Sequence, residues 1–197
     1  METTDEYKTV TDAVAEGFYS EKRSKFYAFC HHVESEDDVK RIVQDYRKRY
    51  YDARHVCYAY VLGPDGTTFR LNDDGEPSST AGKPIHGQIV KNELTDILIV
   101  VIRYFGGVKL GTSGLLTAYK AAAADAIDHA EIETRQVEEN VEFDFAYIMM
   151  NDVMKVVKDM QPKIVSQTYD NTCSITLRIR KSQVQQLRSR LDALAFK

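Results

Sequence analysis

The chain has few cysteines, and their spacing matches no familiar framework. Cys30, Cys57 and Cys173 are widely separated, odd in number and free of any C-x-x-C pair. This pattern disfavours both a disulfide scaffold and a zinc finger. We therefore expect three reduced thiols with structural roles, because an isolated cysteine on a strand behaves most often as a small core residue.

Long apolar runs are also missing. The longest candidate, Ile97–Ile102, has the length of a strand and is far shorter than the ~18 residues that cross a bilayer. The chain starts with acidic and polar residues such as Glu2 and Asp5, whereas a signal peptide starts with basic and then apolar residues. We expect no membrane association and a cytoplasmic location.

Several common catalytic motifs are absent. The sequence holds no G-x-x-x-x-G-K-[ST], G-x-S-x-G, H-E-x-x-H or G-x-G-x-x-G pattern. The usual signatures of phosphate-loop enzymes, serine hydrolases, zinc proteases and dinucleotide-binding folds are thereby excluded. We expect no cofactor and no bound metal. Whether the protein is an enzyme stays open, and a binding role is favoured.

The charge is modest in total but unevenly distributed. Hydrophobic residues make up 43% of the 197 and charged residues 28%, a balance typical of globular proteins. The formal charge of −4 opposes generic binding to polyanions. Residues 161–197, however, carry seven Lys or Arg against two Asp, and the only charges within residues 97–124 are Arg103, Lys109 and Lys120. Local positive surfaces are therefore expected.

Periodicity predicts an α+β domain over residues 1–134. Strands are expected at residues 9–20, 24–33, 55–62, 67–71 and 96–104, and helices at 35–50, 85–91 and after the glycines that end at Gly114. Ser35 and Asp38 have the spacing of a capping box. The nearly continuous apolar run before Tyr104 predicts a buried central strand.

A second pattern begins near residue 135. Residues 135–197 predict a ferredoxin-like βαββα domain, with a turn at residues 170–171 between its last two strands. Asn151 and Ser182 are the expected N-caps of its two helices, since both precede apolar residues at helical spacing. We expect His31 and His32, in the first domain, to lie exposed at the end of a strand.

A glycine-rich segment is the first candidate site. Its members are Arg103, Gly106, Gly107, Lys109, Gly111, Thr112, Ser113 and Gly114. Glycines let the backbone approach a ligand closely, and a helix N-terminus offers unpaired N–H groups and positive potential. These features favour a phosphate or another anion. The structural alternative is an ordinary turn followed by a capped helix.

An acidic loop at residues 73–84 is the second candidate. Asp73, Asp74 and Glu76 lie close together in it, and Pro77 and Pro84 stiffen it. Carboxylates of this kind can bind magnesium or act as an acid/base pair. The favoured interpretation is that they cap backbone groups and pair with arginines.

Arg54 and His55, at the start of a strand, form the third candidate. His55, His86 and Cys57 together raise the alternatives of a metal site or a cysteine nucleophile. Cys57 occupies a buried position in the strand alternation, so a core role is favoured.

The same segments carry a family resemblance. Asp-Asp-Gly-Glu-Pro-Ser-Ser-Thr-Ala-Gly-Lys-Pro at 73–84 and Val-Ile-Arg-Tyr-Phe-Gly-Gly-Val-Lys-Leu-Gly-Thr-Ser-Gly-Leu at 101–115 resemble signatures of the IMPACT/YigZ family. Ser24-Lys25-Phe26 and Arg54-His55-x-Cys57-x-Ala59 match earlier motifs of that family in the same order. By motif the resemblance spans roughly residues 10 to 130.

The resemblance implies a fold and a functional context. The N-terminal domain would share its fold with a domain of a small-subunit ribosomal protein and with domain four of elongation factor G. The ferredoxin-like domain would resemble domain five of the same factor. Eukaryotic relatives act in translational control. Kinases of the galactokinase type share the N-terminal fold and bind phosphate with a similar glycine- and serine-rich loop.

These observations lead to one main hypothesis. We expect a translation-linked regulator that binds RNA or the ribosome, without duplex DNA as a partner. The expected phosphate contacts are Lys25, Arg54, His55, Lys83, Arg103, Lys109 and the Gly106–Gly114 loop, with Asp73, Asp74 and Glu76 as supporting acids. The alternatives are an enzyme acting on a phosphorylated small molecule or nucleotide, with or without magnesium, and a protein partner in translation control.

Overall fold

The computed structural model describes residues 5–169 and 172–195, which divide into two compact units. One unit runs from Tyr7 to Arg135, and the other joins residues 5 and 6 to the stretch that begins at Gln136. Each unit mixes helices and strands, as expected for an α+β chain with two parts. The division into domains at residues 1–134 and 135–197 stays a prediction.

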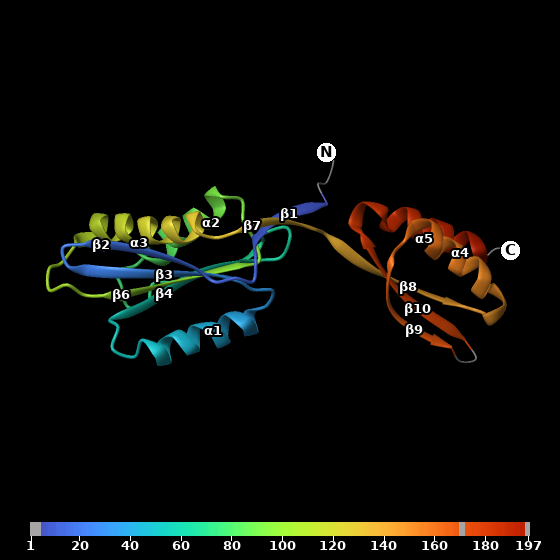
Figure 1. Ribbon diagram of the computed structural model, residues 1–197, viewed down its shortest axis with the longest axis horizontal. Helices are drawn as coiled ribbons and strands as arrows, with labels where there is room; N and C mark the ends of the chain where they lie inside the picture. The colour runs from blue at the N-terminus through green and yellow to red at the C-terminus, as the bar shows by residue number, and fades with distance from the viewer. Residues whose placement is uncertain (1–4, 170–171, 196–197) are drawn as a thin grey trace. The chain divides into compact units, whose positions relative to one another are not determined.

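The first unit is built on a five-stranded sheet between two helical layers. Its order is β2 (Ala15–Glu21), β3 (Ser24–His32), β6 (Ile97–Tyr104), β4 (His55–Leu62) and β5 (Thr68–Asn72), and all neighbours are antiparallel. Helix α1 (Glu36–Arg49) covers one face, and α2 (Gly82–Lys91) and α3 (Gly111–Asp128) cover the other (Figure 1). Strands β1 (Glu6–Val10) and β7 (Ile132–Gln136) form a separate ladder.

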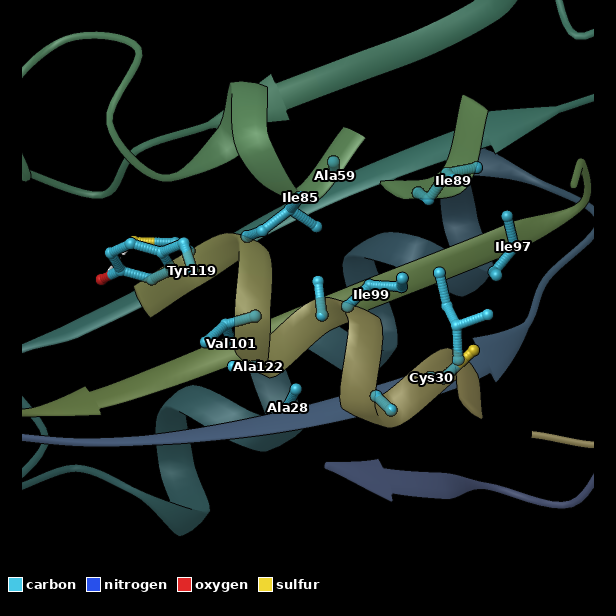
Figure 2. Packing of buried hydrophobic residues seen from close by; sticks show 14 of the residues in the cluster. Ala28, Cys30, Ala59, Ile85, Ile89, Ile97, Ile99, Val101, Tyr119 and Ala122 are labelled. Atoms are coloured by element: carbon cyan, nitrogen blue, oxygen red, sulfur yellow. Dashed lines mark hydrogen bonds between the residues drawn. The ribbon is translucent and has the colours of Figure 1, made fainter. Parts of the chain in front are cut away.

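Strand β6 is central and buried on both faces, as its apolar run predicts. Its residues alternate between two apolar clusters, because successive side chains of a strand point to opposite faces. Ile97, Ile99 and Val101 pack under α2 and α3, as Figure 2 shows, whereas Leu98 and Val100 belong to the cluster under α1. A strand with a core on each side needs apolar residues at every position.

Small residues bring α3 directly onto the sheet. Gly17 of β2 lies so close to α3 that an added Cβ would stand 2.3 Å from the Ala126 nitrogen and 2.8 Å from the Ala122 oxygen. Ala122, Ala123 and Ala126 are fully buried in this contact. The alanine run therefore serves close packing as well as helix formation.

Of two local expectations, one is confirmed and one is wrong. The Ser35 hydroxyl accepts the Asp38 N–H at 3.2 Å and so caps α1. The single strand expected at residues 9–20, in contrast, is two strands in different sheets. Residues up to Val10 pair with β7, and β2 starts at Ala15. The sequence alternates through both strands, so periodicity alone cannot show the change of partner.

The second unit has the expected βαββα order. It comprises β8 (Glu138–Phe145), the 3₁₀ turn η1 (Tyr147–Met149), α4 (Met150–Met160), β9 (Lys163–Tyr169), β10 (Cys173–Arg180) and α5 (Lys181–Ala195), with sheet order β8-β10-β9. Its core includes Val141, Val153, Leu177 and Leu187. The turn predicted at residues 170–171 lies outside the described residues. No described helix in either unit has the length and hydropathy needed to cross a membrane.

Both caps predicted for this unit are wrong. Asn151 is the second residue of α4, and the capping residue, Met149, makes no side-chain bond. Ser182 lies inside α5, where its N–H donates to Oδ2 of Asp5 at 2.9 Å. Hydrogen bonding from Ser182, chiefly from its side chain and also from its N–H, lowers the pKa of the Asp5 carboxyl. The carboxylate of Asp5 therefore accepts an N–H group at the N-terminus of α5, where a negative charge is favourable. Local sequence spacing cannot reveal this contact, because Asp5 lies at the start of the chain.

Candidate functional site

The acidic loop between β5 and α2 is held by its own carboxylates. Asp73 accepts three backbone N–H groups, from Ser79 at 2.8 Å, Ala81 at 3.0 Å and Gly82 at 2.8 Å. Because Ala81 provides no side-chain cap for α2, Asp73 satisfies the free N–H groups at that helix end from a distance. Its role is backbone capping, the alternative favoured from the sequence.

Asp74 ties the same loop to β4 and α1. Its Oδ2 accepts the Val56 N–H at 2.7 Å, and its Oδ1 accepts from Arg47 of α1 at 2.7 Å. The Asp74 carbonyl oxygen lies 2.7 Å from Nδ1 of His55. A carbonyl can only accept, so Nδ1 carries the proton, and Nε2 of the neutral ring is left as an acceptor.

Glu76 and Arg103 form a buried ion pair. Arg103 Nη1 donates to Glu76 Oε1 at 2.5 Å, and the side chains are only 6% and 3% exposed. Tyr119 of α3 donates a second hydrogen bond to the same oxygen at 2.8 Å. His55 Nε2 lies 3.8 Å from Oε2 of Glu76. Loop, strand and helix therefore meet at one carboxylate, which fixes the position of the Arg103 guanidinium.

Arg103 retains unused hydrogen-bonding capacity. Its guanidinium lies 5.5 Å from the ring centre of Phe26 and 5.7 Å from that of Phe105, distances suited to cation–π contact. Its Nε atom is buried and has no hydrogen-bond partner among the described residues. Such groups are rare, because leaving a buried donor unpaired costs about 1–3 kcal/mol.

Cys57 is a poor candidate for a nucleophile. The thiol donates to the Asp73 carbonyl oxygen at 3.1 Å and to the Tyr119 hydroxyl at 3.4 Å. Burial raises the pKa of the Cys57 thiol, and burial also raises the pKa of Tyr119. Both groups stay protonated at neutral pH, whereas nucleophilic attack needs a thiolate. Cys57 thus has the structural role expected of it.

A pocket of about 420 Å³ opens beside this cluster. One part of its lining is polar and comprises Arg54, His55, Glu76, Arg103, Lys109 and Thr112. The other part is apolar and comprises Pro77, Phe105, Leu110 and Leu115. The volume lies within the range of small-molecule sites. The pocket therefore combines apolar walls with the guanidinium of Arg103, which Glu76 holds in place.

The exposed part of this pocket is positively charged. Arg54 and Lys109 are both exposed, and neither forms an ion pair with a described residue. The Arg54 N–H donates to the Arg103 carbonyl oxygen at 3.0 Å, which holds the start of β4 against the end of β6. Helix α3 begins at Gly111, also in the lining, and has no side-chain cap. Two free cations and a helix N-terminus together favour an anion.

The structure gathers some predicted residues and separates others. Arg54, His55, Glu76, Arg103, Lys109, Gly111 and Thr112 line the pocket, whereas Lys25, Asp73, Asp74, Lys83, Gly106, Gly107, Ser113 and Gly114 do not. Lys25 pairs with Tyr104, whose ring packs on the α1 side, so strand alternation directs Lys25 away from Arg103. The predicted residues therefore do not share one face.

Gly106 has a structural reason of its own. A Cβ at this position would stand 2.1 Å from the Arg23 carbonyl carbon and 2.2 Å from the Ser24 nitrogen. The Gly106 N–H also donates to Ser24 Oγ at 3.1 Å. The close approach that glycine permits here is to the turn between β2 and β3, rather than to a ligand.

The apolar walls of the pocket are the part that sequence reasoning missed. Phe105 lies within the glycine-rich segment, and its side chain is partly exposed although large and apolar. An aromatic residue between a buried strand and a glycine pair was the available signal. No signal in the sequence indicates the hydrogen bond from Tyr119 to Glu76, since the position of Tyr119 on the apolar face of α3 predicts only packing. Among the described residues, no group of three or more His, Cys, Asp or Glu is placed to hold a metal ion.

Comparison with known proteins identifies the family. The model of the Impact N-terminal domain matches residues 22–127, more than half of the chain, and that stretch contains every residue of the pocket. The chain belongs to the IMPACT family.

Relatives extend the match into the second unit. An IMPACT family member of Haemophilus influenzae is 31% identical over 172 residues, which cover 86% of this chain and 84% of that protein. IMPACT family member YvyE of Bacillus subtilis is 37% identical over 131 residues, which cover 66% of this chain and 60% of YvyE. The second match therefore leaves two fifths of YvyE unaccounted for.

One solved structure supports the fold of both units. The crystal structure of a hypothetical protein superposes with a TM-score of 0.77 at 26% identity, covering 95% of this chain and 92% of that one. The two-domain translational regulator Yih1 matches at a TM-score of 0.40 and 21% identity, covering 66% of this chain and 52% of Yih1. Only the first of these values indicates a shared fold.

Proposed function

We propose that this IMPACT family member is a translation-linked regulatory protein of the cytoplasm that binds RNA or the ribosome. The main support is the pocket at the end of β6, where Arg54 and Lys109 are exposed and form no ion pair with any described residue, next to the start of α3, which has no side-chain cap. Because no described carboxylate pairs with them, Arg54 and Lys109 are available to bind phosphates. The translational context comes from family membership together with the role of eukaryotic relatives.

The pocket narrows the contact surface expected from the sequence. Arg103 is buried and paired with Glu76, so its part in this proposal is to shape the floor of the pocket. Direct contacts are assigned to Arg54, Lys109, Thr112 and the backbone at Gly111. The likeness of the two units to a ribosomal-protein domain and to domains four and five of elongation factor G belongs to the same proposal.

Co-sedimentation with ribosomes tests this function. The wild type is expected to co-sediment at low salt and to be released at moderate salt, because phosphate contacts weaken as salt rises. Lys109→Ala and Arg54→Ala are each expected to reduce the bound fraction. Lys155→Ala, in α4 of the other unit, removes an exposed positive charge that is paired with Asp152, and serves as control. A folded wild type that stays in the supernatant at low salt and also fails to bind single-stranded RNA would refute the proposal.

One observation favours a second candidate, an enzyme acting on a phosphorylated small molecule or nucleotide. His55 lines the pocket with a fixed ring, and its Nε2 lies 3.8 Å from the Glu76 carboxylate. A histidine oriented by a carbonyl on one nitrogen is suited to proton transfer on the other. A thermal-shift screen of nucleotides and sugar phosphates, with and without magnesium, followed by product analysis, separates this candidate from simple binding.

A further inference from the structure

The apolar walls of the pocket are more than phosphate binding needs. A groove that tracks a nucleic-acid backbone requires cations and N–H groups, which Arg54, Lys109 and the start of α3 already provide. Phe105 nevertheless exposes 47% of its side chain in the same lining as Pro77 and Leu110. Exposing a large ring in a pocket has a clear use where a flat ligand packs on it.

An independent observation points to a ligand with a polar atom. Arg103 lines the pocket, is 95% buried, and has an Nε without any hydrogen-bond partner among the described residues. Its Nη1 donates one hydrogen bond to Glu76. Nε has almost no accessible surface, so an acceptor atom on a bound molecule pairs with it only if the guanidinium moves towards the pocket. The unpaired Nε of Arg103 is an observation separate from the helix N-terminus and from the exposed cations.

We propose that the pocket binds a single unpaired nucleotide, with its base against the Phe105 and Pro77 wall and its phosphate between Arg54, Lys109 and the start of α3. The proposal rests on the proposed function and names what that site takes. The size fits, because a pocket of about 420 Å³ suits one small ligand rather than a duplex. A base stacked within a double helix cannot reach the wall, so the protein binds single strands in preference to duplexes.

The chain contains no tryptophan, which permits a direct optical test. Phe105→Trp places a single indole in the pocket wall, and a base stacked on it quenches its fluorescence. Phe18→Trp is the matched control, since Phe18 is exposed to 46% and lies on β2 outside the pocket lining. Adenosine monophosphate is the probe, with ribose 5-phosphate and inorganic phosphate as ligands that lack a base.

The nucleotide pocket predicts a specific pattern. Adenosine monophosphate quenches Phe105→Trp with saturation and leaves Phe18→Trp unchanged, and the two phosphates without a base do not quench either variant. If adenosine monophosphate leaves the Phe105→Trp signal unchanged up to millimolar concentration, or quenches both variants alike, the pocket does not take a nucleotide.

An RNA arm separates this inference from the proposed function. In fluorescence anisotropy with a labelled single-stranded oligoadenylate, Phe105→Leu is expected to bind about tenfold more weakly than wild type, and Phe105→Tyr to bind like wild type, because stacking on a ring is lost only in the first. RNA binding that is equal in all three proteins overturns the nucleotide pocket and leaves the proposed function standing. Quenching by adenosine monophosphate with neither RNA binding nor co-sedimentation with ribosomes supports the pocket as a site for free nucleotides and refutes the proposed function.

Discussion

Arg103 Nη1 and Glu76 Oε1 lie 2.5 Å apart, and the two side chains are almost completely buried between the end of β6 and the loop before α2. The pair neutralises the floor of the pocket, so the positive character of the site comes from Arg54 and Lys109. It also joins the two segments that carry the family signatures, 73–84 and 101–115, into one structure.

The first prediction concerns this ion pair. Arg103→Ala is expected to lower the free energy of unfolding by about 3–5 kcal/mol, because it leaves the Glu76 carboxylate buried without its cation. Glu76→Leu combined with Arg103→Met is expected to recover a large part of that loss. Urea denaturation followed by circular dichroism measures both. An Arg103→Ala variant as stable as wild type, or a double variant no more stable than Arg103→Ala, would show that the pair does not couple the two segments.

A second prediction compares two of the tyrosine hydroxyls that donate to carboxylates. Tyr119 donates to buried Glu76, and Tyr104 donates to Asp52 at the surface, both at 2.8 Å. Tyr119→Phe is expected to lower the free energy of unfolding by about 1–3 kcal/mol and Tyr104→Phe by less, because only the first leaves a buried acceptor underpaired. The same urea experiment compares them. Equal losses of unfolding free energy in Tyr119→Phe and Tyr104→Phe would contradict a stabilising role for the buried hydrogen bond to Glu76.

Gly106 provides a third prediction. Gly106→Ala is expected to be strongly destabilising, since the new methyl group would collide with backbone atoms of Arg23 and Ser24. Gly87→Ala is the matched control: no atom lies within 4 Å of the added Cβ, and alanine in a helix is worth about 0.5–1 kcal/mol over glycine. The midpoint of thermal unfolding should therefore fall in Gly106→Ala and rise slightly in Gly87→Ala. A Gly106→Ala protein as stable as wild type would contradict the close approach.

The sequence predicts the fold further than it predicts the site. Strand β4, the central position of β6 and the Ser35 cap follow from local patterns, because burial on one or both faces leaves a periodic trace. The split between β1 and β2 and the Asp5 contact to Ser182 depend on partners far along the chain. Local periodicity contains no information about such partners.

For the candidate site, residue types indicate chemistry but not burial. Arg103 and Lys109 look equivalent in the sequence, yet one is paired inside the protein and the other is exposed. Likewise His31 and His32, expected to be exposed, are both partly buried. Their environment is set by residues distant in the chain, such as Tyr46, which lies 2.8 Å from Nε2 of His31.

His31 leads to the fourth prediction, on pH. Burial lowers the pKa of His31 from 6.5 to about 4 in the folded protein. Above pH 6.5 the ring is neutral in both states and costs nothing. As the pH falls from 6.5 towards 4, the unfolded chain binds a proton that the folded one does not, so stability falls, by at most about 3 kcal/mol. Urea denaturation at pH 7.5, 6 and 5 should show a steeper loss for wild type than for His31→Gln. Parallel losses would exclude His31 as the cause.

The most direct test of the central claim is the salt dependence of RNA affinity, with Arg54→Ala, Lys109→Ala and the control Lys155→Ala measured beside wild type. For a single strand, each phosphate contact contributes a slope of about −0.7 in a plot of log affinity against log salt. The account predicts that Arg54→Ala and Lys109→Ala each bind more weakly and with a slope shallower by about that amount, while Lys155→Ala matches wild type. Slopes that are the same in all four proteins would contradict phosphate binding at the pocket.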